Sequence, residues 1–240
     1  MSANTTLALI PHYRHLTTLP AVVSAMRACG LPVLVVDDGS GADCHDALSA
    51  LRGNGTEVLL LPQNGGKGHA FKHGTAWAAQ HGFSHVLQID ADAQHCFEDV
   101  PKLLAQSAAR PAALVCANPV YGSDAPKARR YGRKITNFWN WLHTGSHDIK
   151  DGLCGLRIYP LPATQRLIDT AHIGNGMDFD NEILIRLYWH GTPLCWVDTP
   201  VRYHQNGVSH FHALRDNIVI SKMHARLFFD GMARRLGRRR

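Results

Sequence analysis

The chain has 240 residues, 45% hydrophobic and 18% charged, a balance typical of a folded globular protein rather than a disordered or fibrous one. Its formal net charge is +6, and the last twenty residues hold seven basic side chains against one acidic. The body is therefore neutral, which argues against a protein that grips nucleic acid across its surface. We find neither an apolar run of the ~18 residues needed to cross a bilayer nor a secretory signal, so we expect a cytoplasmic protein with reduced cysteines.

Short apolar runs alternate with helical patterns along the first half of the chain. The expected strands are 7–10, 33–36, 58–61, 86–89 and 113–117, and the expected helices are 16–28, 43–51, 69–80 and 98–108. This alternation with short loops predicts an α/β domain, Rossmann-like, with a mostly parallel sheet flanked by helices. The pattern changes near residue 120, so we expect one domain over 1–210, made of halves 1–120 and 121–210, followed by 211–240.

The segment 211–240 contains the basic cluster. Just before its arginines stand Ile220, Met223, Leu227 and Phe228, a spacing that favours an amphipathic helix. A basic amphipathic helix can lie on an anionic membrane surface, where each Lys or Arg contributes roughly 1 kcal/mol. The alternative is a helix docked on the core and followed by a solvated tail.

Acidic residues follow the strand expected at 86–89. Asp90 and Asp92 flank Ala91, and Gln94 stands two residues further on. Carboxylate and amide oxygens at the end of a buried strand are ligands for Mg²⁺ or Mn²⁺, and such an ion neutralises a diphosphate. A solvated turn is the alternative, because this short pattern occurs widely by chance.

Two further polar segments lie at strand ends. Asp37 and Asp38 end the strand 33–36, where carboxylates can accept hydrogen bonds from a nucleoside or simply close a turn. Asn64 opens the glycine-rich loop 64–68, in which Lys67 can meet phosphate. The loop has the spacing of neither a P-loop nor a dinucleotide-binding fingerprint.

Four motifs together resemble the family 2 glycosyltransferases, in the branch of dolichyl-phosphate mannose synthase and bacterial polyprenyl-phosphate glycosyltransferases. They are Ile10-Pro11-His12-Tyr13, Val36-Asp37-Asp38-Gly39-Ser40, Asn64-Gly65-Gly66-Lys67-Gly68 and Asp90-Ala91-Asp92-Ala93-Gln94-His95. The resemblance implies a GT-A fold, a nucleotide-diphospho-sugar donor carrying UDP or GDP, a divalent metal ion and an inverting mechanism. It makes 1–120 the donor half and 121–210 the acceptor half.

The resemblance also assigns residues to the donor. Contact with the nucleotide-sugar is expected from Pro11, Tyr13, Asp37, Asp38, Asn64, Lys67, Asp90, Ala91 and Asp92, and metal ligation from Asp90, Asp92 and Gln94. His12 stands where the family often has another residue, so we assign it no role.

Acceptor-side residues follow in the second half. Arg130, Arg133, Arg157 and Arg202 are candidates for acceptor or phosphate contact, although a solvated helix face or an ordinary ion pair explains arginines equally well. Asp180, with Glu182 next, is the candidate catalytic base, and Asp92 completes the catalytic set. Acids at a helix start are often only caps, and an already ionised phosphate acceptor needs no strong base.

The sequence therefore favours a metal-dependent inverting glycosyltransferase that serves a lipid-linked or polyprenyl-phosphate acceptor while peripherally bound to the inner face of the membrane. The alternatives are a sugar-phosphate nucleotidyltransferase and a non-catalytic nucleotide-sugar binding module. The first would need a glycine-rich loop with an arginine after the first strand, where Pro11 and Tyr13 stand. The second would bind donor without turnover.

Overall fold

The computed structural model describes residues 5–120, 127–200 and 213–237. Its strands are β1 (Thr6–His12), β2 (Val33–Asp37), β3 (Thr56–Leu60), β4 (His85–Gln88), β5 (Leu114–Val120), β6 (Arg157–Pro160) and β7 (Leu194–Pro200). Its α-helices are α1 (Leu19–Ala28), α2 (His45–Ser49), α3 (Lys67–Gln80), α4 (Val100–Ala109), α5 (Lys127–Thr144), α6 (Leu161–Thr170), α7 (Phe179–Trp189) and α8 (Ala213–Gly237). Short 3₁₀ turns, Ala42–Cys44 and Phe97–Asp99, precede α2 and α4.

The strands form one seven-stranded sheet in the order β3-β2-β1-β4-β6-β5-β7. All neighbours pair in parallel except β6, which is antiparallel to both β4 and β5. The expected mostly parallel α/β sheet is confirmed, and each expected strand and helix of the first half overlaps an observed one. The sheet continues from the first half of the chain into the second without a break.

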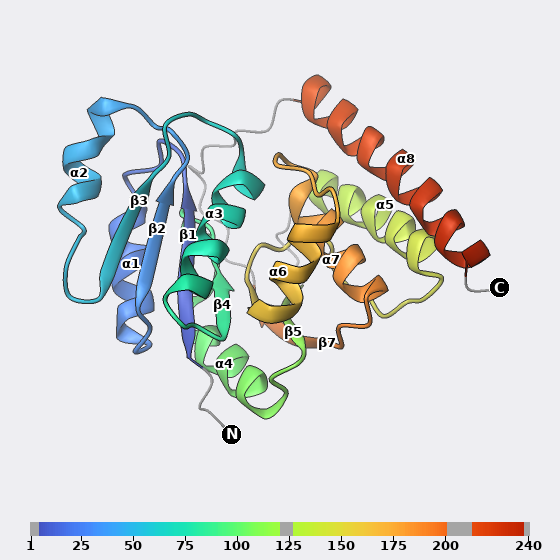
Figure 1. Ribbon diagram of the computed structural model, residues 1–240, viewed down its shortest axis with the longest axis horizontal. Coiled ribbons are helices and arrows are strands. Elements are labelled where there is room, and N and C mark those ends of the chain that lie inside the picture. Colours follow the sequence, from blue (N-terminus) through green and yellow to red (C-terminus); the bar gives the residue numbers. More distant parts are fainter. Residues whose placement is uncertain (1–4, 121–126, 201–212, 238–240) are drawn as a thin grey trace.

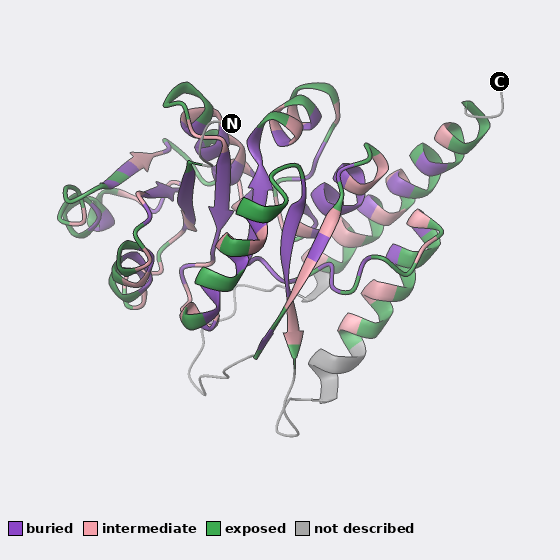
Figure 2. Ribbon diagram, turned by 90° about the horizontal axis from the view of Figure 1, so that it is seen from below, coloured by how far each residue is buried: buried purple, intermediate pink, exposed green. Residues whose placement is uncertain are grey.

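The central strands of the sheet are largely buried (Figure 2). Their alternate residues build two cores, one on each face of the sheet. Val33 and Val35 belong to the core that includes residues of α1, α2 and α4, whereas Leu34 and Val36 belong to the core that includes residues of α3, α6 and α7. Three of these helices begin with a proline in the first turn, a position where the missing N–H has no helical partner. The sheet is thus covered on both sides, which explains the unbroken apolar run of β2.

The long helices α5 and α8 run side by side at the end of the molecule away from α2 (Figure 1). On α8, Met223 and Leu227 are buried against the body, Ile220 is half-buried and Phe228 is 45% exposed. The apolar stripe expected to face a membrane therefore mostly docks the helix on the protein. This agrees with the alternative stated above, a helix docked on the core. In the part of the chain that the structure describes, no helix has the length and apolar character to cross a membrane.

Candidate active site

The carboxyl ends of β1, β2 and β4 meet at one edge of the sheet, because these three strands are parallel neighbours. This edge brings together His12, Asp37 and the loop that begins at Asp90. Open α/β sheets bind their ligands at this edge. The acidic motifs that the sequence analysis found at strand ends therefore meet at one edge of the sheet.

Asp37 lies fully buried among protein partners. Its Oδ1 is 2.7 Å from His12 Nδ1 and also accepts the Ser40 hydroxyl, and its Oδ2 accepts the Ser40 N–H at 3.0 Å. The His15 N–H donates to His12 Nε2 at 3.0 Å, so His12 is neutral and its Nδ1 carries the proton. Burial lowers the pKa of His12 more than Asp37 raises it. Both Asp37 oxygens are thus occupied, and its contact with a nucleoside stays a prediction.

Asp38 organises the glycine-rich loop. Its Oδ2 accepts the N–H groups of Gly65 and Gly66 at 3.0 and 2.6 Å, and its Oδ1 is 2.8 Å from His69 Nδ1. The side chain is 3% exposed. The loop therefore takes its shape from Asp38, which leaves little of that carboxylate for a ligand.

Lys67, the first residue of α3, joins the two halves of the chain. Its Nζ lies 2.5 Å from Asp90 Oδ1, after β4, and 2.7 Å from Asp180 Oδ2, in the first turn of α7. Gln88 holds the other Asp180 oxygen through Nε2 at 2.8 Å. We call Lys67, Asp90 and Asp180 the Lys67 bridge. Their side chains are 24%, 29% and 15% exposed, respectively, so solvent and ligands can reach them.

The Lys67 bridge is strongly charged. Burial would lower the pKa of Lys67, but Asp180 and Asp90 together raise it well above its ordinary value, so the lysine stays an ammonium. Burial likewise works against ionisation of Asp90, yet Lys67 and His95 hold its pKa well below the ordinary range. Asp90 in turn raises the pKa of His95 to about 10 against the effect of burial. The edge thus holds two cations, Lys67 and His95, paired with the two carboxylates of Asp90 and Asp180.

The segment 151–155 presses against this bridge. A side chain at Gly155 would bring a Cβ to 2.5 Å from Asp90 Oδ2 and 2.7 Å from Lys67 Nζ, so it would displace the Lys67–Asp90 pair. Asp151 shapes the segment by accepting the N–H groups of Leu153 and Cys154 at 2.9 and 2.7 Å. Arg133 of α5 pairs with the other Asp151 oxygen. Arg133 thus ties α5 to the site through Asp151.

The Asp90–Gln94 loop offers the donor set that a hard divalent cation prefers. Asp92 is partly exposed and its Oδ1 accepts the Gln94 N–H at 3.0 Å, whereas Ala91 is buried and its carbonyl accepts the Thr18 hydroxyl at 2.5 Å. Within residues 5–120, 127–200 and 213–237 no group of three or more His, Cys, Asp or Glu is arranged to hold a metal ion. The carboxylate and amide chemistry fits Mg²⁺ or Mn²⁺, but the Lys67 ammonium occupies the position beside Asp90.

Glu182 lies in a buried ion-pair cluster, two residues past Asp180. Its oxygens accept Arg186 at 2.9 Å, Arg226 of α8 at 3.0 and 2.6 Å, and the Gly174 N–H at 2.8 Å. Burial opposes its ionisation, but the arginines and Gly174 lower its pKa overall. Since none of the residue is exposed, the structure gives Glu182 the task of anchoring α8 on α7 instead of taking a substrate proton.

Arg157 is also buried completely, contrary to the expectation of a phosphate-facing side chain. Its Nη1 donates to the Asp180 carbonyl at 2.5 Å, and its Nη2 donates to the Gly152 carbonyl at 2.9 Å. It therefore fixes the start of α7 beside the Lys67 bridge. The side chain of Arg130 and all of Arg202 lie outside the described residues.

The remaining donor candidates lie around the edge. Pro11, within β1, and Tyr13, just after it, are half-buried, and Asn64 is exposed. The Arg14 guanidinium lies 5.6 Å from the centre of the Tyr13 ring. Sequence reasoning assigned no role to His12 and missed the Lys67 contact with Asp180. The partners of Lys67 are far apart in the chain, so no local pattern reveals them.

Comparison with known proteins decides the family. Residues 8–169, more than half of the chain, match the family model described as "Glycosyl transferase family 2". The chain belongs to glycosyl transferase family 2. It is thus a glycosyltransferase, and the GT-A fold expected from the motifs is confirmed.

The relatives of this glycosyltransferase include enzymes named for lipid-linked acceptors. It is 28% identical over 209 residues to a polyprenol monophosphomannose synthase of Mycolicibacterium smegmatis, covering 82% of the chain and 77% of the relative. It is 33% identical over 114 residues to an undecaprenyl-phosphate mannosyltransferase of Micrococcus luteus, covering 45% and 46%.

Among solved structures, the fold is similar to that of S. aureus TarS 1–349 in complex with UDP-GlcNAc, with a TM-score of 0.62 and 14% identity. That comparison covers 93% of the chain but 66% of TarS, less than two thirds of its length. At this identity the likeness shows the fold alone.

Proposed function

We propose that this glycosyltransferase moves a sugar, with inversion, from a UDP- or GDP-sugar to a polyprenyl phosphate or a closely related lipid-linked acceptor. The observation that carries the proposal is the Lys67 bridge, which joins the loop after β4 to the start of α7 at the ligand edge of the sheet. The names of the two mannosyl-transferring relatives support a polyprenyl acceptor.

Each half of the chain has its own task in this proposal. The donor half, 1–120, holds the nucleotide-sugar between the loops after β1 and β4 and the glycine-rich loop, with Pro11, Tyr13 and Asn64 within reach of the nucleoside. Lys67 faces the diphosphate and stabilises its departure. The acceptor half, 121–210, presents the acceptor oxygen to the opposite side of the sugar, with Arg130, Arg133 and Arg202 as its candidate phosphate contacts.

Mg²⁺ or Mn²⁺ belongs to the proposal as a cofactor. Asp90, Asp92 and Gln94 would hold the ion, which when bound would neutralise charge on the diphosphate. Asp90 would then hold the ion in place of Lys67. Lys67 would keep its contact with Asp180, which lies on a different segment from Asp90.

Asp180 acts on the acceptor in one of two ways. Toward a hydroxyl it takes the proton as general base. Toward a phosphate, which is already ionised, it orients Lys67 and the acceptor. The proposal further places the enzyme at the cytoplasmic face of a membrane, bound peripherally through the basic segment 211–240 to anionic lipid.

The first experiment titrates GDP- and UDP-sugars with and without Mn²⁺ and then measures transfer to a short polyprenyl phosphate. We expect metal-dependent donor binding that Asp92→Ala abolishes, followed by transfer. Donor binding without any turnover would replace the enzyme by a binding module, and unchanged titration of Asp92→Ala would discard the metal site. Equal sedimentation with anionic vesicles after deletion of 232–240 would discard the membrane contact.

A further inference from the structure

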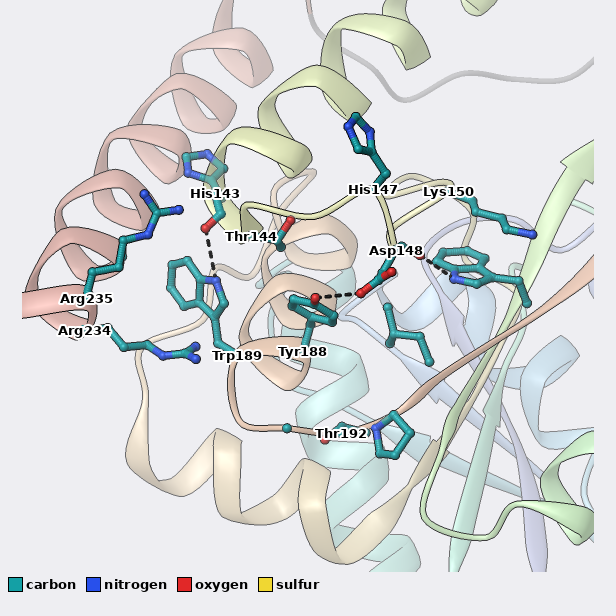
Figure 3. A pocket seen from close by; sticks show the side chains of 15 residues that line it. His143, Thr144, His147, Asp148, Lys150, Tyr188, Trp189, Thr192, Arg234 and Arg235 are labelled. Atoms are coloured by element: carbon teal, nitrogen blue, oxygen red, sulfur yellow. Dashed lines mark hydrogen bonds between the residues drawn. The ribbon is translucent and has the colours of Figure 1, made fainter. Parts of the chain in front are cut away.

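A pocket of about 730 Å³ opens between the ends of α5 and α7, the start of β7 and the last turns of α8 (Figure 3). It is separate from the Lys67 bridge: Asp180 lies in the first turn of α7, whereas Tyr188 and Trp189 line the pocket from the last. Over that length the helix rises roughly 12 Å. The volume of the pocket is within the range of small-molecule sites.

Cationic side chains dominate one end of the pocket. Arg234 and Arg235 project from α8 on either side of Trp189, and the Arg234 guanidinium lies 5.7 Å from the centre of a Trp189 ring (Figure 3). The Trp189 indole N–H donates to the His143 carbonyl at 3.3 Å, which fixes the ring. A guanidinium pair beside a fixed aromatic face suits a phosphate group.

The opposite end of the pocket holds its carboxylate, Asp148. The Tyr188 hydroxyl donates to Asp148 Oδ2 at 2.8 Å and is the main reason why the pKa of Asp148 is lowered. Lys150 also lines the pocket, whereas His143 is neutral because burial, then His224 and Arg235, lower its pKa to about 4. The lining thus carries three cations, Lys150, Arg234 and Arg235, against one carboxylate.

Apolar side chains extend from the lip of the pocket. On α8, Phe229, Met232 and Leu236 are 67%, 46% and 63% exposed, on the face opposite the docked Met223 and Leu227. On α5, the exposed Ile135, Phe138, Trp139 and Leu142 follow helical spacing. We name these two sets the outer stripes.

Arg235 stands where the pocket meets both outer stripes. It falls between Met232 and Leu236 along α8, and its Nη2 donates to the Leu142 carbonyl of α5 at 3.4 Å. An occupant of the pocket is thus expected to be anionic at one end and apolar at the other. A water-soluble anion would leave the outer stripes uncovered.

We propose that the pocket binds the phosphate headgroup of an anionic phospholipid, whose acyl chains lie along the outer stripes of α5 and α8. This proposal rests on the membrane contact in the proposed function. It assigns that contact to a defined pocket and not to the basic C-terminal residues as a whole. The lipid would hold the enzyme with α5 and α8 against the bilayer, at the surface where a polyprenyl acceptor is found.

The test measures binding of dihexanoyl phosphatidylglycerol, below its critical micelle concentration, to the full chain by isothermal titration calorimetry. We expect saturable binding of one lipid, at least tenfold weaker in Arg234→Gln/Arg235→Gln. The matched control is Lys222→Gln, which also removes a cation from α8 but outside the pocket lining, and it should bind within twofold of the parent. Absence of saturable binding, or an equal loss in Lys222→Gln, would overturn the pocket.

Three further arms separate the alternatives. Glycerol 1-phosphate should bind more weakly than the lipid, and equal binding would make the occupant a soluble phosphate and overturn the lipid assignment. A stable dimer that Phe229→Ser/Leu236→Ser dissociates would assign the outer stripes to a second copy and overturn it too. Donor binding by Arg234→Gln/Arg235→Gln should match the parent, and its loss would attribute the effect to misfolding.

Failure of the proposed function is distinguishable from failure of the pocket. If the parent binds the lipid probe saturably but transfers no sugar to a detergent-dispersed polyprenyl phosphate, the transferase proposal fails and the lipid site stands. If it transfers sugar but binds no lipid probe, the lipid site fails alone.

Discussion

Two groups of carboxylates occupy the same edge of the sheet with opposite surroundings. Asp37, the last residue of β2, and Asp38, which follows it, are buried and bonded to histidines, a serine and loop N–H groups. Asp90 and Asp180 are partly exposed and share the Lys67 ammonium. The first group shapes the site, and the second is open to ligands and to exchange of the Lys67 ammonium. Acidic residues at a strand end therefore serve two different tasks that the motif alone does not separate.

The largest effect is expected at the exposed group. Asp180→Asn should lower kcat by about 10²-fold or more, since it removes the charge that orients Lys67 and serves the acceptor. Donor affinity should change little. Steady-state transfer with a titrated donor measures both quantities.

A matched control for this variant is Asp178→Asn, two residues earlier, whose carboxylate faces Gly176 and Arg226. It should keep kcat within about fivefold. A full rate in Asp180→Asn, or an equal loss in both variants, would remove Asp180 from the working site.

At the buried group the expected effect is on stability. Asp37→Ala leaves the His12 Nδ1–H and two Ser40 donors unpaired, which should lower the free energy of unfolding by about 3 kcal/mol. Urea denaturation measures this, with the exposed Asp43→Ala as a control expected within about 0.5 kcal/mol. A variant of full stability that no longer binds donor would instead make Asp37 a nucleoside ligand.

Glu182 belongs with the buried group although it lies near Asp180 in sequence. Arg226→Gln removes one of the arginines that neutralise it and should cost about 2 kcal/mol of stability, because Arg186 remains as a partner. Lys222→Gln, one turn earlier on α8, should cost less than about 0.5 kcal/mol. Equal effects of the two substitutions would mean that α8 is not anchored through Glu182.

The smallest effect is a pH dependence at His12. Its pKa is lowered below the ordinary 6.5 mainly by burial, so the unfolded chain binds the proton more readily. Stability from this group is full above pH 6.5 and is lost as the pH falls through the lowered value, by at most about 1.4 kcal/mol per pH unit. Denaturation between pH 7 and 5 should give a shallower loss for His12→Asn than for the parent. Identical slopes would contradict a buried neutral His12.

The helices and strands of the first half could be predicted because each is specified by residues within its own segment. The apolar run of β2, the spacing within α3 and the proline at the start of α4 specify strand and helix without reference to distant residues. The motifs at strand ends also placed Asp90 and Asp38 at one edge, since parallel neighbours end together.

The partners of these residues could not be predicted from local pattern. Lys67 meets Asp180 across 113 positions, and Arg226 meets Glu182 across 44. Arg157 has the sequence context of a phosphate ligand, yet it is buried and donates to the carbonyls of Gly152 and Asp180, which lie on separate segments. The same limitation applies to α8, whose docked and outer faces both carry apolar residues at helical spacing.

The central claim is that the Lys67 ammonium, which lies between Asp90 and Asp180, serves sugar transfer. The most direct measurement is the transfer rate of Lys67→Gln beside that of Lys72→Gln. Lys72 lies on the same helix, and its ammonium donates to the Ile173 carbonyl and to Asn175 Oδ1. We expect kcat to fall at least 100-fold in Lys67→Gln and less than fivefold in Lys72→Gln, with both proteins folded. Transfer by Lys67→Gln within fivefold of the parent would contradict the claim.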